Sequence, residues 1–131
     1  MPRIVPEDED FDPDAFSPED ADAALARGIE LFDGGQYHAA HEEFERCWKA
    51  NEAADADFFK GLVQAAICMH HLRRGNVDGA AKLYIGHRRL LGAFLPRHRG
   101  VDVERLLGEM TRVVRGADSA AGRAPRMGDE R

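Results

Sequence analysis

The sequence is poor in long hydrophobic runs and in cysteine. No run approaches the ~18 apolar residues that a membrane helix needs, and the first residues are acidic, unlike a signal peptide. We therefore expect a cytoplasmic protein without a membrane span. The only two cysteines, Cys47 and Cys68, form no C-x-x-C pair. Each falls on the apolar face of a predicted helix, which favours buried free thiols over a disulfide.

Alternation of apolar and polar residues with a period of two, the mark of a half-buried strand, is absent as well. Apolar residues recur instead at helical spacing between helix start and stop signals, and 131 residues suit one domain. The sequence therefore predicts an all-α bundle with no strand, in a domain at 17–116 between an acidic flexible arm at 1–16 and a flexible tail at 117–131. The five expected helices cover about 17–33, 36–51, 55–74, 76–96 and 102–115.

Capping residues set these limits. Ser17, Asp55, Asn76 and Asp102 can each begin a helix, while glycines follow the first and third helices. The third helix is apolar nearly all round, which predicts the buried centre of the bundle. Residues 98–101 are expected to form a loop. The last helix should expose Arg105, Glu109 and Arg112 on its outer face.

The first two helices have the spacing of a tetratricopeptide hairpin, with small residues at Gly28 and Ala40 and an aromatic ring at Phe44. Small residues at these positions would let the two helices approach closely. No second copy follows at the 34-residue period of that repeat, so we do not expect a repeat array.

Charge is unevenly distributed along the chain. Residues 1–22 contain nine acidic residues and one arginine, whereas residues 73–115 contain ten Lys or Arg and four Asp or Glu. The acidic arm could fold over the basic half, with Phe11 and Phe16 as anchors, or remain a solvated tail. The basic half lacks interleaved aromatic residues, so nucleic acid is not favoured as a partner. Arg73 and Arg74 beside a helix start could suggest phosphate binding, but Gly75 and Asn76 are explained as a helix stop and cap.

The most specific stretch runs from Gly34 to Trp48. Its His41 and Glu45 are four residues apart, a spacing that lets two ligands on one helix face share a metal. In the third helix Gln64 and His71 also share a face, two turns apart. If that face meets the second helix, His41, Glu45 and His71 could hold a divalent zinc, iron or manganese ion. Glu45 would then be a third ligand or a general base, with Gln64 as a binding residue and Trp48 closing the pocket.

A structural role for the same cluster is the alternative. A histidine and a glutamate can exchange a charge-assisted hydrogen bond that Gln64 completes, and Trp48 can fill the core. Either His70 or His71 could face the cluster, because their helix is apolar on most sides. Two functions remain open: a metal or small-ligand site, and a non-enzymatic module that binds a protein. A bundle with surplus apolar faces could also form a homo-oligomer.

These residues resemble the DUF309 family, a small all-helical domain of unknown function. The resemblance covers roughly residues 23–95. Its motifs are Gly35-x-Tyr37, His41-Glu42-x-x-Glu45-x-x-Trp48, Phe59-x-Gly61-Leu62-x-Gln64-x-Ala66 and His71-x-x-x-Gly75-Asn76-x-x-Gly79-Ala80. It implies a compact bundle of about five helices with a polar cluster under the tryptophan. The family has no securely assigned activity, and a metal-dependent hydrolase role is sometimes suggested for it.

Overall fold

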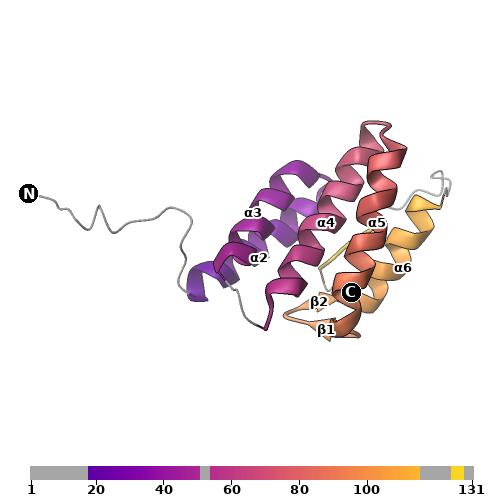
Figure 1. Ribbon diagram of the computed structural model, residues 1–131. Helices are drawn as coiled ribbons and strands as arrows, with labels where there is room; N and C mark the ends of the chain where they lie inside the picture. Colours follow the sequence, from indigo (N-terminus) through magenta and orange to yellow (C-terminus); the bar gives the residue numbers. More distant parts are fainter. Residues whose placement is uncertain (1–17, 51–53, 116–124, 129–131) are drawn as a thin grey trace, which may run out of the picture.

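The computed structural model describes residues 18–50, 54–115 and 125–128, and these residues form a bundle of five α-helices (Figure 1). The predicted all-α architecture is confirmed. The helices are α2 (Pro18–Asp33), α3 (Tyr37–Ala50), α4 (Ala56–Arg73), α5 (Val77–Leu91) and α6 (Val103–Val114), and a 3-10 turn, η1 (Gly92–Phe94), follows α5. The acidic arm, with its two phenylalanines and the expected cap at Ser17, lies outside the described residues.

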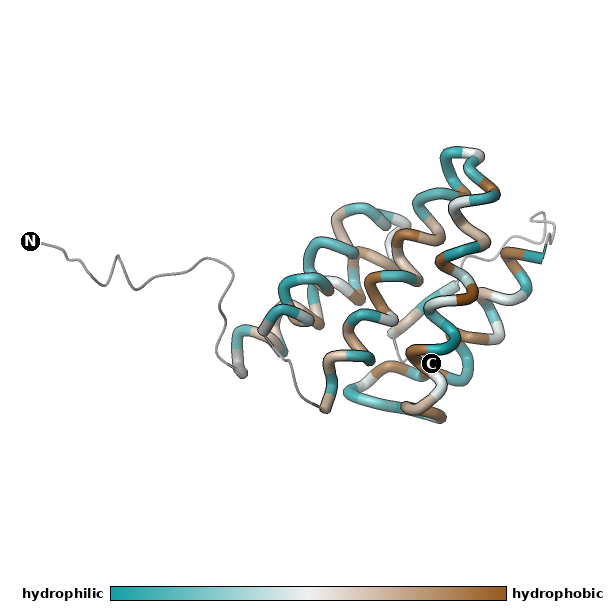
Figure 2. Tube along the Cα trace, viewed as in Figure 1, coloured by the Kyte–Doolittle hydropathy of each residue, from teal (hydrophilic) through white to brown (hydrophobic). Residues whose placement is uncertain are grey.

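Helix α4 occupies the centre of the bundle. It packs between α3 and α5, while α2 packs against α3 and α6 packs against α5 (Figure 1). Figure 2 shows hydrophobic residues recurring along α4, in agreement with the sequence prediction. Its buried residues are Phe58, Phe59, Gly61, Leu62, Val63, Ala65, Ala66, Cys68 and Met69. None of the helices in the described part of the chain has the length and apolar character of a membrane span.

The α2–α3 hairpin depends on a close approach at Gly28. A Cβ atom added there would collide with the ring of Phe44, which is fully buried. Gly35 completes the turn between the two helices at φ 84°, a backbone conformation that glycine adopts without strain. The predicted close packing at Gly28 is confirmed, whereas the likeness to a tetratricopeptide hairpin stays a prediction.

Two of the predicted caps make a side-chain capping bond, whereas Asp55 occupies the predicted cap position of α4 without one. The side chain of Asn76 accepts a hydrogen bond from the Gly79 N–H, and that of Asp102 accepts one from the Arg105 N–H, both at 3.0 Å. Asp55 makes no side-chain capping bond. Its carboxylate faces charged donors from a distant part of the chain, which compete with the backbone amides.

Those donors belong to a β-ribbon that the sequence did not predict. Strand β1 (Arg97–His98) pairs antiparallel with β2 (Val101–Asp102), where a loop was expected. Arg99 and Gly100 connect the strands, both with positive φ (50° and 82°), as in a tight two-residue hairpin turn. Strands of two residues are too short to show alternation, so the pattern could not reveal them.

Arg99 links the ribbon to two helices. Its guanidinium bonds Asp22 of α2 at 3.1 Å and Asp55 at the start of α4, and the ring of His98 donates to the other Asp55 oxygen at 3.0 Å. Partial burial acts to raise the pKa of Asp55, but the hydrogen bonds from Arg99 and His98 outweigh it and hold that pKa below its ordinary value. The carboxylate is thus a structural anchor.

Both cysteines are fully buried thiols, as predicted, and they do not form a disulfide with each other. The thiol of Cys47 donates to the Ala21 carbonyl at 3.4 Å and that of Cys68 to the Ala80 carbonyl at 3.3 Å. Burial is the leading cause that raises the pKa of each thiol to about 12. Neither sulfur is therefore available as a thiolate near neutral pH.

Residues 125–128, which we call the C-terminal segment, pass between α2 and α6 (Figure 1). The sequence placed them in a flexible tail, yet Met127 is fully buried and belongs to the hydrophobic core. Arg105 and Glu109 of α6, expected on an outer face, instead contact this segment. The segment fills the space between the first and last helices.

Candidate functional site

His41 and Glu45 lie on one face of α3, as their spacing predicted. The His41 Nε2 and a Glu45 carboxylate oxygen are 3.8 Å apart. The other ring nitrogen of His41, Nδ1, donates to the His38 carbonyl at 2.8 Å. The side chains are 18% and 40% exposed, so the pair lies at the surface rather than in a buried cluster.

His71 lies on the other side of α4, against α5. Its Nδ1 accepts a hydrogen bond from the Asn76 side-chain amide at 3.2 Å. The ring also packs on Gly79, where an added Cβ atom would lie 3.1 Å from the ring carbon Cδ2. His71 therefore supports the turn that joins α4 to α5.

Gln64 faces α5 as well. Its side-chain oxygen occupies the place that a Cβ atom at Gly86 would take. Since α4 lies between α3 and α5, Gln64 and His71 are on the α5 side of the helix, whereas His41 and Glu45 belong to α3. The structure thus divides the four predicted cluster residues into two pairs.

Trp48, the residue predicted to close the pocket, is a partly buried side chain packed on the core. The ammonium group of Lys60 lies 5.5 Å from the centre of its ring, within the range of a cation–π interaction. Among the residues that the structure describes, no group of three or more His, Cys, Asp or Glu is arranged to hold a metal ion.

His70, rather than His71, faces α3. The His38 ring lies 4.9 Å from the His41 ring and 5.3 Å from the His70 ring, measured between centroids. Desolvation, followed by the charges that His38 and Arg74 can carry, holds the pKa of His70 below its ordinary value. Three histidines from two helices therefore gather at one end of the α3–α4 interface.

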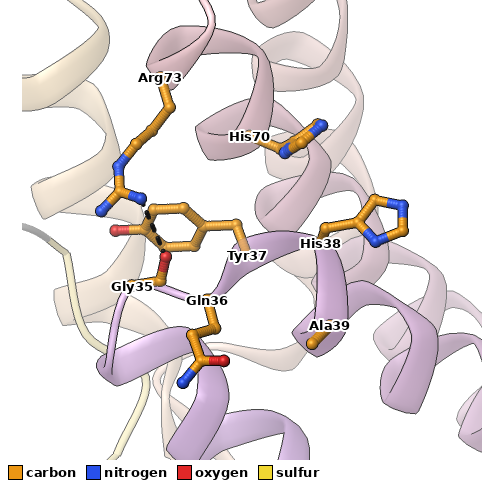
Figure 3. Close-up of a pocket in the computed structure, with 7 residues that line it drawn as sticks. All are labelled: Gly35, Gln36, Tyr37, His38, Ala39, His70 and Arg73. Atoms are coloured by element: carbon orange, nitrogen blue, oxygen red, sulfur yellow. Dashed lines mark hydrogen bonds between the residues drawn. The ribbon is translucent and has the colours of Figure 1, made fainter.

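A surface depression of about 390 Å³ opens beside these histidines (Figure 3). It is lined by Gly35, Gln36, Tyr37, His38, Ala39, His70 and Arg73. Figure 3 shows His38 and His70 on one side of Tyr37 and Arg73 on the other, with the guanidinium directed at Gly35. None of the described residues that line the depression carries a carboxylate. Two carboxylates lie beside lining residues: a Glu42 oxygen is 3.9 Å from the His38 ring, and burial, with a smaller contribution from the charge of Asp33, raises the pKa of Tyr37.

Arg73 is held in place from two directions. Its Nη1 donates to the Gly35 carbonyl at 3.1 Å, and its guanidinium carbon lies 5.0 Å from the centre of the Tyr37 ring. The depression also contains the first turn of α3, whose backbone N–H groups have no partner within the helix and carry the positive end of its dipole. These groups can together donate hydrogen bonds to an anion.

Part of this helical domain matches a known protein family. A sequence model of the family described as Domain of unknown function (DUF309) matches residues 25–83, which are 59 of the 131 residues, and over that segment the chain is similar to this family. The resemblance drawn from the motifs is confirmed. No curated protein matches the chain.

Sequence reasoning selected His41, named His70 only as the alternative to His71, and set Arg73 aside because a helix stop and cap explained the residues that follow it. A signal was present, because His70 and Arg73 are three residues apart and so share one face near the end of α4. The Gly35-x-Tyr37 motif marks the other wall of the depression. Contact between the two required knowing which side of α4 meets α3.

Proposed function

We propose that this protein is a non-enzymatic binding module that captures an anionic group, such as the carboxylates of an acidic protein segment, in the depression at the start of α3. The observation that carries the proposal is the position of Arg73, which reaches from the end of α4 to the first turn of α3. A guanidinium beside helix N-terminal amides is a favourable environment for a carboxylate or a phosphate.

Histidine supports the same conclusion. A bound anion favours the protonated form of His70, so binding takes up a proton and should strengthen as the pH falls. The pKa of His70 lies below its ordinary value in the free protein. The ring is therefore neutral in most molecules at pH 8, and it becomes charged only in acid or on binding. Affinity should therefore be higher at pH 6 than at pH 8.

A glutamate-rich peptide tests the proposal, with its glutamine counterpart as the control ligand. Binding is followed in ¹⁵N-labelled protein by the shifts of the backbone amides of residues 37–39, at pH 6 and at pH 8. Arg73→Gln should weaken binding by about tenfold, the loss expected for one charge-assisted hydrogen bond. Inorganic phosphate, titrated separately, shows whether a free anion occupies the same position.

Arg89→Gln is the matched control, because Arg89 carries the same charge, is exposed on α5 and does not line the depression. It should leave the affinity nearly unchanged. Equal losses in the two variants would mean that the peptide responds only to overall charge, and would contradict the proposal. The metal-dependent hydrolase suggested for the family stays a prediction with its own test, given below.

A further inference from the structure

The space between α2 and α6 holds an extended piece of the protein's own chain, in large part through backbone hydrogen bonds. Asp33, the last residue of α2, accepts two consecutive backbone N–H groups of the C-terminal segment. Its two carboxylate oxygens receive the Met127 and Gly128 amides at 2.7 and 3.0 Å. Two parallel hydrogen bonds accepted by one carboxylate fix the direction of the bound backbone, and they do not involve its side chains.

Helix α6 supplies the opposite wall. The Arg126 N–H donates to a Glu109 carboxylate oxygen at 2.8 Å, and the Arg105 guanidinium donates to the Gly128 carbonyl. Both helices thus bind the backbone of the segment: carboxylates accept from three of its N–H groups, and a guanidinium donates to one of its carbonyl oxygens. We call the site made by Ile29, Asp33, Arg105 and Glu109 the α2–α6 groove.

Side chains add selectivity at two positions. Pro125 and Met127 are buried whereas Arg126 between them is exposed, the alternation of an extended strand lying on a surface. At Gly128 an added Cβ atom would lie 2.6 Å from an Asp33 oxygen and 3.4 Å from an Ile29 methyl group. Because that carboxylate is already held by two amides, the position following the methionine must be glycine.

We propose that the α2–α6 groove is a peptide-binding site, and that the C-terminal segment occupies it in competition with partner proteins. The partner is an extended segment of another protein with a proline, an arginine, a methionine and a glycine in that order, since the Arg126 guanidinium lies 3.6 Å from an Asp33 carboxylate oxygen. The groove shares no lining residue with the depression at the start of α3, and half of it lies beyond the DUF309 match. The two proposals can therefore fail separately.

The first test uses the full chain with Met127→Glu, which places a charge in the buried position and vacates the groove. A fluorescent peptide with the sequence of residues 123–131 should bind this variant. Replacing the glycine of the peptide that corresponds to Gly128 with alanine should weaken binding by about tenfold or more, because of the clash with Asp33. Asp33→Asn, added to Met127→Glu, should weaken it comparably.

The second test keeps the wild-type chain, so it does not depend on the folding of the variant. A tethered segment competes at an effective concentration of about 1 mM, so unlabelled peptide at several millimolar should displace it. Displacement is read from the ¹⁵N signals of Met127 and Gly128. Absence of displacement at these concentrations, or equal binding of the glycine and alanine peptides, would overturn the proposal.

Discussion

His87 is a buried histidine whose ring is only partly satisfied. It is fully buried on α5, and its Nδ1 donates to the Leu83 carbonyl at 3.3 Å. Its Nε2 has no hydrogen-bond partner among the described residues. Burial is the main cause that lowers the pKa of this imidazole to about 4. Protonating the ring in the folded protein is therefore unfavourable.

This makes stability depend on pH in a defined direction. In the unfolded chain His87 binds a proton near pH 6.5, while the folded protein does not bind it until about pH 4. Its effect on stability is therefore absent well above pH 6.5 and grows as the pH falls toward 4. We expect a loss of about 2 kcal/mol between pH 7 and pH 4.5, measured by urea unfolding, and His87→Leu should remove that part of the pH dependence.

His38→Gln serves as the control, because the His38 side chain is exposed. This variant should lose as much stability in acid as the wild type does. An unchanged acid loss in His87→Leu would contradict the assignment to His87.

Among the candidate site residues, the sequence identified partners within a helix but not between helices. The His41–Glu45 pair followed from spacing alone. The directions of Gln64 and His71 did not, because α4 is apolar on most sides and its pattern gives no preferred face. Gly86 and Asn76 on the following helix decide those directions by offering space and a hydrogen bond.

Contact between α4 and α5 depends on the absence of a side chain at Gly86. The Gln64 side chain fills that space, so a methyl group there would have to displace it or separate the helices. We expect Gly86→Ala to lower the free energy of unfolding by about 1–3 kcal/mol, as overpacking does, measured by denaturant or thermal unfolding.

Gly92→Ala is the matched control. Gly92 follows α5 with helical backbone angles, and an added Cβ atom would meet nothing within 4 Å. Its substitution should be neutral or slightly stabilising. Shortening the partner as well, with Gln64→Ser, should restore part of the stability lost in Gly86→Ala; a purely additive double variant would argue against the clash.

Element boundaries were predictable where local chemistry decides them. Asn76 and Asp102 bond the amides three residues ahead, as caps do. Asp55 precedes a helix as Asp102 does, but its carboxylate accepts hydrogen bonds from Arg99 and His98, which are more than forty residues away in the chain. These donors compete with the backbone amides of the first turn of α4. A capping signal is therefore reliable only when no distant charge competes for the carboxylate.

At the scale of the whole molecule, metal content separates a binding module from a metal-dependent hydrolase. Protein purified without a metal-binding tag and without chelator should contain no stoichiometric zinc, iron or manganese, because His41 and His71 face different helices. Elemental analysis checks this, together with His41→Ala. Near-stoichiometric metal that is lost in His41→Ala would contradict our view of the site and favour the hydrolase.

The bundle itself was predictable from helical periodicity, but its closure was not. The segment 125–128 has only four residues, one of them charged and one a glycine. It is too short to show a periodic pattern of apolar residues. Its position depends on Asp33, 94 residues earlier than Met127. Long-range partners of this kind leave no local signature in a single sequence.

The bond between Asp33 and Met127 also bears on the order of folding. Helices α3, α4 and α5 follow one another in the chain and pack on their neighbours, so their contacts close short loops. Joining α2 to the C-terminal segment closes a loop that contains nearly all the other described residues, and its entropic cost is larger. We expect such contacts to form after the rate-limiting step of folding, and contacts formed that late slow unfolding more than they speed folding. The C-terminal segment should therefore act chiefly on the lifetime of the folded state.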